Sequence, residues 1–225
     1  MLARNQFKPE SFNSNVITTG NKDIDNVIDG YGKEISLIYG PGASGKTTLV
    51  KLAAMGQLKL GKKVVFVDTE NSFSVDRFMQ LCGPNYLYYL NRLLLLKANG
   101  FDEQCRRIDS LIRLVDIDLI VIDSLGIHYR KEVRNNPKEI NTKMDRQLRI
   151  LTEITRKGIP VLITNQVSQN PETGEIKSVG GDMVKNWVKR LIELKKDPRR
   201  IFLIRPEERS AEFEIVNEGI KILAR

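Results

Sequence analysis

Short apolar runs alternate along the chain with longer segments in which apolar residues recur every three or four positions. Strands are predicted at residues 35–39, 63–68, 119–123 and 159–165, and helices at 48–60, 102–115 and 137–157. Continuous apolar runs are typical of strands buried on both faces, and the longer spacing is typical of amphipathic helices. Strands that alternate with helices predict an α/β fold, in which helices cover both faces of a mostly parallel sheet.

Shorter elements complete this pattern. Helices are predicted at 21–28 and 76–81, and each of the β-like runs at 86–90 and 93–96 is a candidate sheet strand. The last part of the chain predicts strands at 187–194, 201–205 and 213–216, which would extend the sheet as an antiparallel meander. We expect residues 1–20 to form an extended arm and residues 21–225 to form one core domain.

Composition narrows the class of protein. The chain has 225 residues, enough for one large α/β domain, and 41% of them are hydrophobic. Its apolar runs are too short to span a bilayer and residues 1–20 lack a signal-peptide core, so we expect a cytoplasmic protein. Cys82 and Cys105 are expected to be reduced, and the single histidine, His128, cannot anchor a Cys/His zinc site alone.

One segment carries a strong chemical signal. It matches the phosphate-binding pattern G-x-x-x-x-G-K-[ST] at every required position, through Gly40, Pro41, Gly42, Ala43, Ser44, Gly45, Lys46 and Thr47. Thr48 continues it into the predicted helix, whose N-terminus favours an anion. Lys46 is expected to reach the β- and γ-phosphates, and the Thr47 hydroxyl to bind Mg²⁺. The sequence therefore predicts a site for a nucleoside triphosphate.

Polar residues follow the predicted strands at the edge where ligands of α/β sheets bind. Asp123 ends an apolar run and is expected to complete the Mg²⁺ site with Thr47, although an acid there can also cap the next segment. Glu70 is the candidate for orienting the water that attacks the γ-phosphate, with an ordinary charged loop residue as the alternative. Gln166 could contact the γ-phosphate, or could be an ordinary polar strand end.

Further motifs occur in a fixed order. They are Thr18-Thr19-Gly20-Asn21-Lys22-Asp23-Ile24-Asp25, residues 39–48, Phe66-Val67-Asp68-Thr69-Glu70, Arg77, Ile122-Asp123-Ser124-Leu125, His128-Tyr129-Arg130, Ile163-Thr164-Asn165-Gln166-Val167, Gly180-Gly181 and residues 213–220. Together they resemble the RecA/RadA recombinase ATPases, and most closely the archaeal RadB group, over nearly the whole chain.

This resemblance implies a RecA-like P-loop NTPase core that binds ATP and Mg²⁺. It makes Glu70 the catalytic glutamate, Asp123 the Walker B acid and Gln166 the nucleotide sensor. It also implies that Arg77 stacks on the adenine ring through a cation–π contact. The segments 126–136 and 167–181 take the places of the family's two DNA-binding loops.

The chain departs from the family pattern at several points. It begins almost at the ATPase core, and its first 20 residues lack the Phe-x-x-Ala motif that joins recombinase subunits, so a monomer or dimer is expected rather than a filament. Asp182 stands where a histidine is usual, and a carboxylate near the γ-phosphate would repel it. The second loop lacks aromatic residues for base stacking. We therefore predict weak ATP hydrolysis and no strand-exchange engine.

The net charge of +8 suggests a polyanionic partner, with DNA, preferably single-stranded, as the leading candidate and solubility as the alternative. One predicted DNA-binding group comprises His128, Tyr129, Arg130, Lys131 and Arg134, with Tyr129 as a stacking ring. Basic residues also crowd the start of the meander, where Lys195, Lys196, Arg199 and Arg200 are the candidates and a solvated hairpin is the alternative. His128 is either part of a nucleotide-to-DNA relay or a packed residue.

These features predict an ATP- and DNA-binding accessory protein of homologous recombination and DNA repair, with weak ATPase activity. The resemblance implies that the main recombinase and a Holliday-junction resolvase are partners. Two alternatives remain open. One is a ring-forming ATPase of the helicase or clock type, for which Arg199, Arg205 and Arg209 are candidate arginine fingers. The other is an interaction module in which the nucleotide is structural or regulatory.

Overall fold

The computed structural model describes residues 16–169 and 176–223. Its strands are β1 Ile35–Gly40, β2 Val64–Asp68, β3 Leu93–Lys97, β4 Leu119–Asp123, β5 Val161–Gln169, β6 Ile176–Ser178, β7 Arg190–Lys196, β8 Arg199–Arg205, β9 Arg209–Val216 and β10 Gly219–Ile222. Its helices are α1 Lys22–Ile28, α2 Lys46–Lys59, α3 Val75–Cys82, α4 Tyr86–Leu90, α5 Phe101–Leu111, α6 Gly126–Glu132, α7 Pro137–Arg156 and α8 Gly181–Lys185.

The strands form one sheet in the order β10-β9-β8-β7-β1-β5-β4-β2-β3, and β6 pairs with the end of β5. The strands from β7 through β1, β5, β4 and β2 to β3 are parallel to their neighbours, whereas β7 to β10 form an antiparallel meander. This arrangement confirms the predicted α/β fold with a mostly parallel sheet and an antiparallel C-terminal extension. The carboxyl ends of β1, β2, β4 and β5 therefore share one edge.

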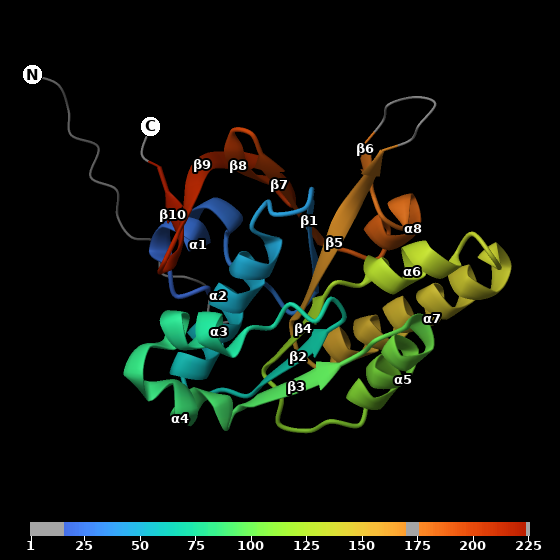
Figure 1. Ribbon diagram of the computed structural model, residues 1–225, viewed down its shortest axis with the longest axis horizontal. Coiled ribbons are helices and arrows are strands. Elements are labelled where there is room, and N and C mark those ends of the chain that lie inside the picture. Colours follow the sequence, from blue (N-terminus) through green and yellow to red (C-terminus); the bar gives the residue numbers. More distant parts are fainter. Residues whose placement is uncertain (1–15, 170–175, 224–225) are drawn as a thin grey trace, which may run out of the picture.

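Helices cover both faces of the parallel part of the sheet (Figure 1). Helices α2 to α4 pack on one face, where Phe66 of β2 joins Leu49 and Phe78 in a buried core, and α1 packs against the antiparallel strands β8 to β10. Helices α5 to α8 pack on the other face, where Val65 of the same strand joins a second core with Leu148. Successive residues of a strand point to opposite faces, so a strand buried on both sides must be apolar throughout. This requirement explains the continuous apolar runs of β1, β2 and β4.

Local signals set several helix boundaries. The Asn21 side chain accepts hydrogen bonds from the amides of Asp23 and Ile24 at the start of α1. Asn136 caps α7, which begins with Pro137, a residue suited to the first turn because it lacks an amide donor. Of the described helices, none combines the length and apolar character needed to cross a membrane.

Three predicted elements differ in the structure. Residues 86–90 form the short helix α4, so only β3 of the two candidate runs is a strand. Helix α5 ends at Leu111 rather than near 115, because the chain turns there toward β4 and leaves Val115 78% exposed. Residues 126–132, which we expected to be part of a loop, form helix α6.

The predicted N-terminal arm lies largely outside the described residues, which begin at residue 16. Within the described part, Ile17 pairs with Tyr31 through two backbone hydrogen bonds of 2.8 Å. Thr19 donates to the Asp25 carboxylate from both its amide, at 2.7 Å, and its hydroxyl, at 2.8 Å. Residues 17–19 are thus held against the start of the core domain.

Candidate nucleotide-binding site

The phosphate-binding segment lies between β1 and α2, as its sequence predicts. Ala43 and Gly45 both adopt positive φ angles, of 58° and 105°, and these conformations curl the backbone before the helix begins at Lys46. The first amides of a helix have no carbonyl one turn earlier to bond, and they carry a partial positive charge. The Ser44 hydroxyl is buried without a hydrogen-bond partner among the described residues. The turn therefore offers donors to an anion.

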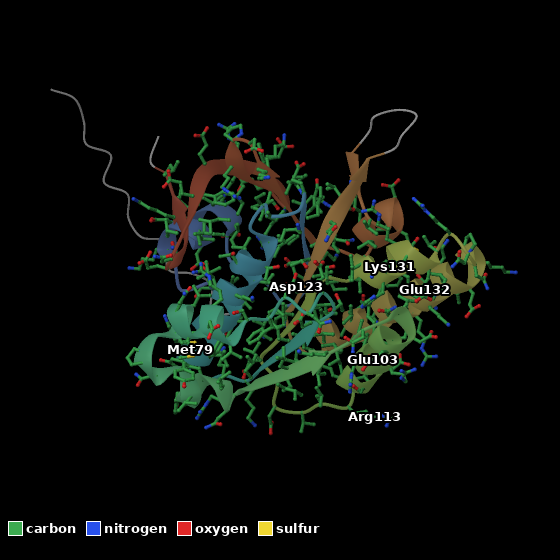
Figure 2. The ribbon with its side chains drawn as sticks, in the orientation of Figure 1. Met79, Glu103, Arg113, Asp123, Lys131 and Glu132 are labelled. Carbon is green, nitrogen blue, oxygen red and sulfur yellow. The ribbon has the colours of Figure 1, made fainter. Side chains whose placement is uncertain are left out.

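A cavity of about 430 Å³ opens beside this turn. It is lined by residues 42–48 together with Glu70, Asp123, Gln166, Arg199 and Ile215. Figure 2 shows Asp123 near the middle of the molecule, at the end of β4. The volume falls in the range of sites that bind small molecules. The structure thus brings together the phosphate-binding segment and the three polar residues predicted at strand ends.

The Lys46 ammonium is held against the phosphate-binding turn itself. It donates to the carbonyl oxygens of Gly40, at 3.0 Å, and Pro41, at 2.7 Å. Burial lowers the pKa of Lys46, and the nearby charges of Glu70 and Asp123 oppose that shift. A multiply charged anion in the cavity would stabilise the charged form of this partly buried ammonium group.

Thr47 and Asp123 meet in the way expected of a magnesium site. The Thr47 hydroxyl donates to one carboxylate oxygen of Asp123 at 2.8 Å, and the Thr164 hydroxyl donates to the other. Burial raises the pKa of Asp123, while these two hydrogen bonds oppose the rise. Mg²⁺ is commonly held by one or two carboxylates, with phosphate and water oxygens completing its octahedron. A hydroxyl and one carboxylate at the phosphate-binding turn are ligands of this kind, so the Thr47–Asp123 pair fits Mg²⁺ bound together with phosphate.

Glu70 reaches the same cavity from the segment that follows β2. Its carboxylate accepts a hydrogen bond from the Ser124 hydroxyl at 2.5 Å, and the Gln166 amide nitrogen lies 3.3 Å from it. The carboxylate and the amide predicted as catalytic residue and sensor are therefore in direct contact. This contact lets one side chain respond to the position of the other.

Two residues that sequence reasoning did not single out position Glu70. Asp68 is fully buried and accepts hydrogen bonds from the amides of Glu70, Ser72 and Phe73, at 3.2, 3.1 and 2.9 Å. Ser124 holds the Glu70 carboxylate and also exchanges two hydrogen bonds with Thr69. Their places at strand ends were visible in the sequence, but their partners depend on the pairing of β2 with β4.

Gln166 is also tied to the hairpin formed by β5 and β6. The Val179 amide donates to the Gln166 carbonyl at 2.9 Å, and the Asn165 side-chain amide donates to the Val179 carbonyl at 2.6 Å. This hairpin occupies the second predicted DNA-binding loop, of which residues 170–175 lie outside the described residues. Asp182, expected near the γ-phosphate, is instead exposed at the start of α8 and does not line the cavity. That expectation was wrong.

Arg77 lies on α3, outside the lining of the cavity. Its guanidinium donates to the carbonyl oxygens of Val216, at 3.0 Å, and Asn217, at 2.8 Å, and so fastens α3 to the turn between β9 and β10. The predicted stacking of Arg77 on an adenine ring remains a prediction.

The first predicted DNA-binding group, at helix α6, contains two buried and three exposed residues. Tyr129 is only 9% exposed and donates its hydroxyl proton to Asn141 at 2.8 Å, and the buried His128 ring contacts the Ala98 carbonyl oxygen at 2.9 Å. The expected stacking ring is therefore packed in the core, and His128 is a packed residue. Arg130, Lys131 and Arg134 are exposed, and Figure 2 shows Lys131 on α6.

The residues of the second basic group, at the hairpin of β7 and β8, also have different surroundings. Lys195 and Lys196 are exposed. The Lys195 ammonium lies 4.7 Å from the centre of the Phe202 ring, and Arg200 forms a 2.6 Å ion pair with Glu212. Arg199 turns instead toward the cavity, where it donates to the Ala43 carbonyl at 2.9 Å.

Comparison with known proteins gives a consistent result. The sequence model of the Rad51 family matches residues 13–222. A protein of Thermococcus kodakarensis named DNA repair and recombination protein RadB is 36% identical over 92% of this chain and 99% of its own length. A RadB protein of Methanococcus maripaludis is 33% identical over 85% of this chain and 93% of its own. A crystal structure described as the RadB recombinase matches with a TM-score of 0.79 and 36% identity, over 92% of this chain and all of that one.

Proposed function

Because the chain belongs to the Rad51 family, and is similar to RadB proteins over most of its length, we propose that it is an accessory protein of homologous recombination and DNA repair that binds ATP and DNA. In this role ATP binding controls how the protein holds DNA, and hydrolysis is slow. Its partners are the main recombinase and a Holliday-junction resolvase. The similarity to RadB proteins is the ground for proposing these two partners.

The single observation that carries the proposal is the convergence of Lys46, Thr47, Glu70, Asp123 and Gln166 on one cavity. These residues come from four separate parts of the sequence, and each is of the chemical type that phosphoryl transfer requires. Backbone amides and Lys46 would hold the phosphates, and Thr47 with Asp123 would hold Mg²⁺. The bound metal ion would neutralise charge that develops on the phosphate oxygens.

Hydrolysis requires a water molecule oriented toward the γ-phosphate, and we assign this task to Glu70. Its carboxylate already accepts a hydrogen bond from Ser124 and contacts Gln166. A carboxylate has lone pairs left beyond these two contacts, so a water molecule in the cavity can also donate to Glu70. Ser124 and Gln166 would compete with this water for the carboxylate, and we expect slow turnover for this reason.

The contact between Gln166 and Glu70 also suggests how ATP would be sensed. A γ-phosphate that draws the Gln166 amide away from Glu70 would shift the end of β5, whose backbone is bonded to Val179. The β5–β6 hairpin would then report the nucleotide state to DNA. The exposed Lys195 and Lys196, with Arg130, Lys131 and Arg134 of the α6 region, supply positive charge for the DNA backbone.

The test is the binding of a fluorescent single-stranded oligonucleotide across a salt series, with no nucleotide, with ATP and with a non-hydrolysable ATP analogue. We expect binding that weakens as salt rises, because bound phosphates release counterions, and that differs between the nucleotide states. Binding that does not change with salt would contradict the electrostatic part of the proposal. Identical binding in all three nucleotide states would contradict the control by ATP.

A further inference from the structure

We propose that Arg199 is a ligand of the nucleotide's phosphate chain, supplied within the same subunit by the β7–β8 hairpin. The inference rests on the proposed function, because it concerns the same nucleotide cavity. It separates Arg199 from the basic residues beside it, which are DNA-binding candidates. It also differs from the arginine finger of the ring-forming alternative, which a neighbouring subunit would supply. It also makes the hairpin part of the nucleotide site.

The position of Arg199 is the first argument. Its side chain lines the cavity, and its Nη1 atom donates to the carbonyl oxygen of Ala43 at 2.9 Å. Ala43 lies inside the phosphate-binding turn, three residues before Lys46. Two cations therefore rest on carbonyl oxygens of this turn, Arg199 on Ala43 and Lys46 on Gly40 and Pro41.

The backbone explains how a residue so distant in sequence reaches the turn. Strand β7 is the direct neighbour of β1, with Glu193 opposite Tyr39. A side chain on Gly40 would lie 2.2 Å from the Leu194 carbonyl oxygen, so the two strands approach closely at the point where the turn begins. Strand β7 continues past the end of β1, and the hairpin returns as β8 with Arg199 as its first residue. Close packing at Gly40 thus holds the hairpin beside the turn.

The chemistry of the cavity is the second argument. Among the described residues, Lys46 and Arg199 are the cations that line it, and Glu70 and Asp123 are the anions. A nucleoside triphosphate adds several negative charges to this balance. A guanidinium group has five N–H donors, of which the contact with Ala43 uses one, and its planar fork matches two oxygens of a phosphate. Arg199 can therefore bind phosphate while it remains at the turn.

The adjacent residue provides a matched control. Successive side chains of a strand point to opposite faces, and Arg200 accordingly pairs with Glu212 rather than facing the cavity. The two arginines share a strand and a charge, and both are partly exposed. They differ in direction and in partner, because only Arg199 reaches the cavity and Arg200 is paired with Glu212.

The experiment measures binding of a non-hydrolysable MgATP analogue, and of inorganic tripolyphosphate with Mg²⁺, by calorimetry. The proteins are the wild type, Arg199→Ala, Arg199→Lys and Arg200→Ala. We expect Arg199→Ala to weaken both ligands roughly tenfold or more, as is typical for the loss of hydrogen bonds to a charged group. Arg199→Lys should lose less, because it keeps the charge but not the fork. Arg200→Ala should bind both ligands as the wild type does.

Other results would overturn the inference. Equal binding by the wild type and Arg199→Ala would do so while leaving the proposed function intact. A loss confined to the ATP analogue, with tripolyphosphate unaffected, would assign Arg199 to the base or ribose instead of the phosphates. A wild type that binds neither ligand would overturn both the inference and the proposed function. Thermal unfolding of each variant checks that the fold is retained.

Discussion

Asp123, which lines the nucleotide cavity, lies only three residues before Gly126, where helix α6 begins, yet the cavity and the helix present polar side chains in different ways. At the cavity, buried groups such as Asp68 and Thr164 hold the functional side chains in place while leaving them accessible from the cavity. On α6, His128 and Tyr129 are turned into the core, whereas Arg130 and Lys131 are exposed. Proximity to the strand ends is therefore not enough to make a residue functional.

The contacts of α6 supply the physical reason for this difference. A side chain on Gly126 would lie 2.2 Å from the Asn165 side-chain oxygen and 2.9 Å from Val179, so α6 starts in close contact with β5. The next turn packs against the core, where Tyr129 contacts Phe101 and Asn141 and His128 contacts Ala98. The comparison teaches that the cavity is built for ligand contact and the inner face of α6 for stability. The predictions below test that division.

The largest effect is expected at the cavity. Glu70→Gln keeps the shape of the side chain but removes its capacity to accept a proton, so ATP turnover should fall by roughly two orders of magnitude or more. Glu132→Gln, at the end of α6, is the matched control and should leave turnover unchanged. Steady-state phosphate release measures both. A Glu70→Gln rate equal to that of the wild type would remove Glu70 from the mechanism.

The second prediction concerns the inner face of α6. Tyr129→Ala deletes a buried aromatic side chain and should lower the free energy of unfolding by about 3 kcal/mol, without changing DNA affinity beyond the effect of unfolding. Tyr88→Ala, at a position 52% exposed whose ring contacts Arg92, should change it by about 1 kcal/mol or less. Chemical denaturation measures both values. Unchanged stability with weakened DNA binding would show that Tyr129 is a DNA-binding residue after all.

A smaller effect is expected at the exposed lysines of the hairpin. The double variant Lys195→Ala/Lys196→Ala should weaken single-stranded DNA binding several-fold and reduce the slope of log affinity against log salt by about 1.4, from two lost phosphate contacts. The pair Lys62→Ala/Lys63→Ala serves as the control, because it lies at the amino end of β2, whereas Lys195 and Lys196 lie at the carboxyl end of β7. If the two double variants lose equal affinity, DNA binding depends on net charge rather than on the hairpin.

The smallest effect is a pH dependence. Burial raises the pKa of Tyr129, so the folded protein keeps the phenol proton at pH values where the unfolded chain loses it. The folded state should therefore lose stability as pH rises past the ordinary tyrosine value of about 10. The absorbance titration of the wild type minus that of Tyr129→Phe should give a midpoint above this value. A midpoint at the ordinary value would indicate an exposed ring.

The cavity was largely predictable from sequence because its chemistry is local. The phosphate-binding turn is one continuous segment, and Glu70, Asp123 and Gln166 each follow a recognisable strand. Parallel strands bring their carboxyl ends to one edge, so the convergence of these residues followed from the fold class.

Features that depend on packing between distant segments were not predictable in the same way. The burial of Tyr129 depends on its contacts with Phe101 and Asn141, and the split between Arg199 and Arg200 depends on the register of β7 beside β1. The helix at 86–90 was ambiguous because a short apolar run fits either a strand or one turn of a helix. In each case the deciding information lies in the tertiary partner.

Calorimetric titration of the wild type and Lys46→Ala with a non-hydrolysable MgATP analogue tests the central claim most directly. Our account predicts saturable binding at one site in the wild type, and at least tenfold weaker binding in Lys46→Ala because a charged phosphate contact is lost. Thermal unfolding should remain close to that of the wild type. Absence of binding in the wild type, or equal affinity in both proteins, would contradict the assignment of this cavity to a nucleotide.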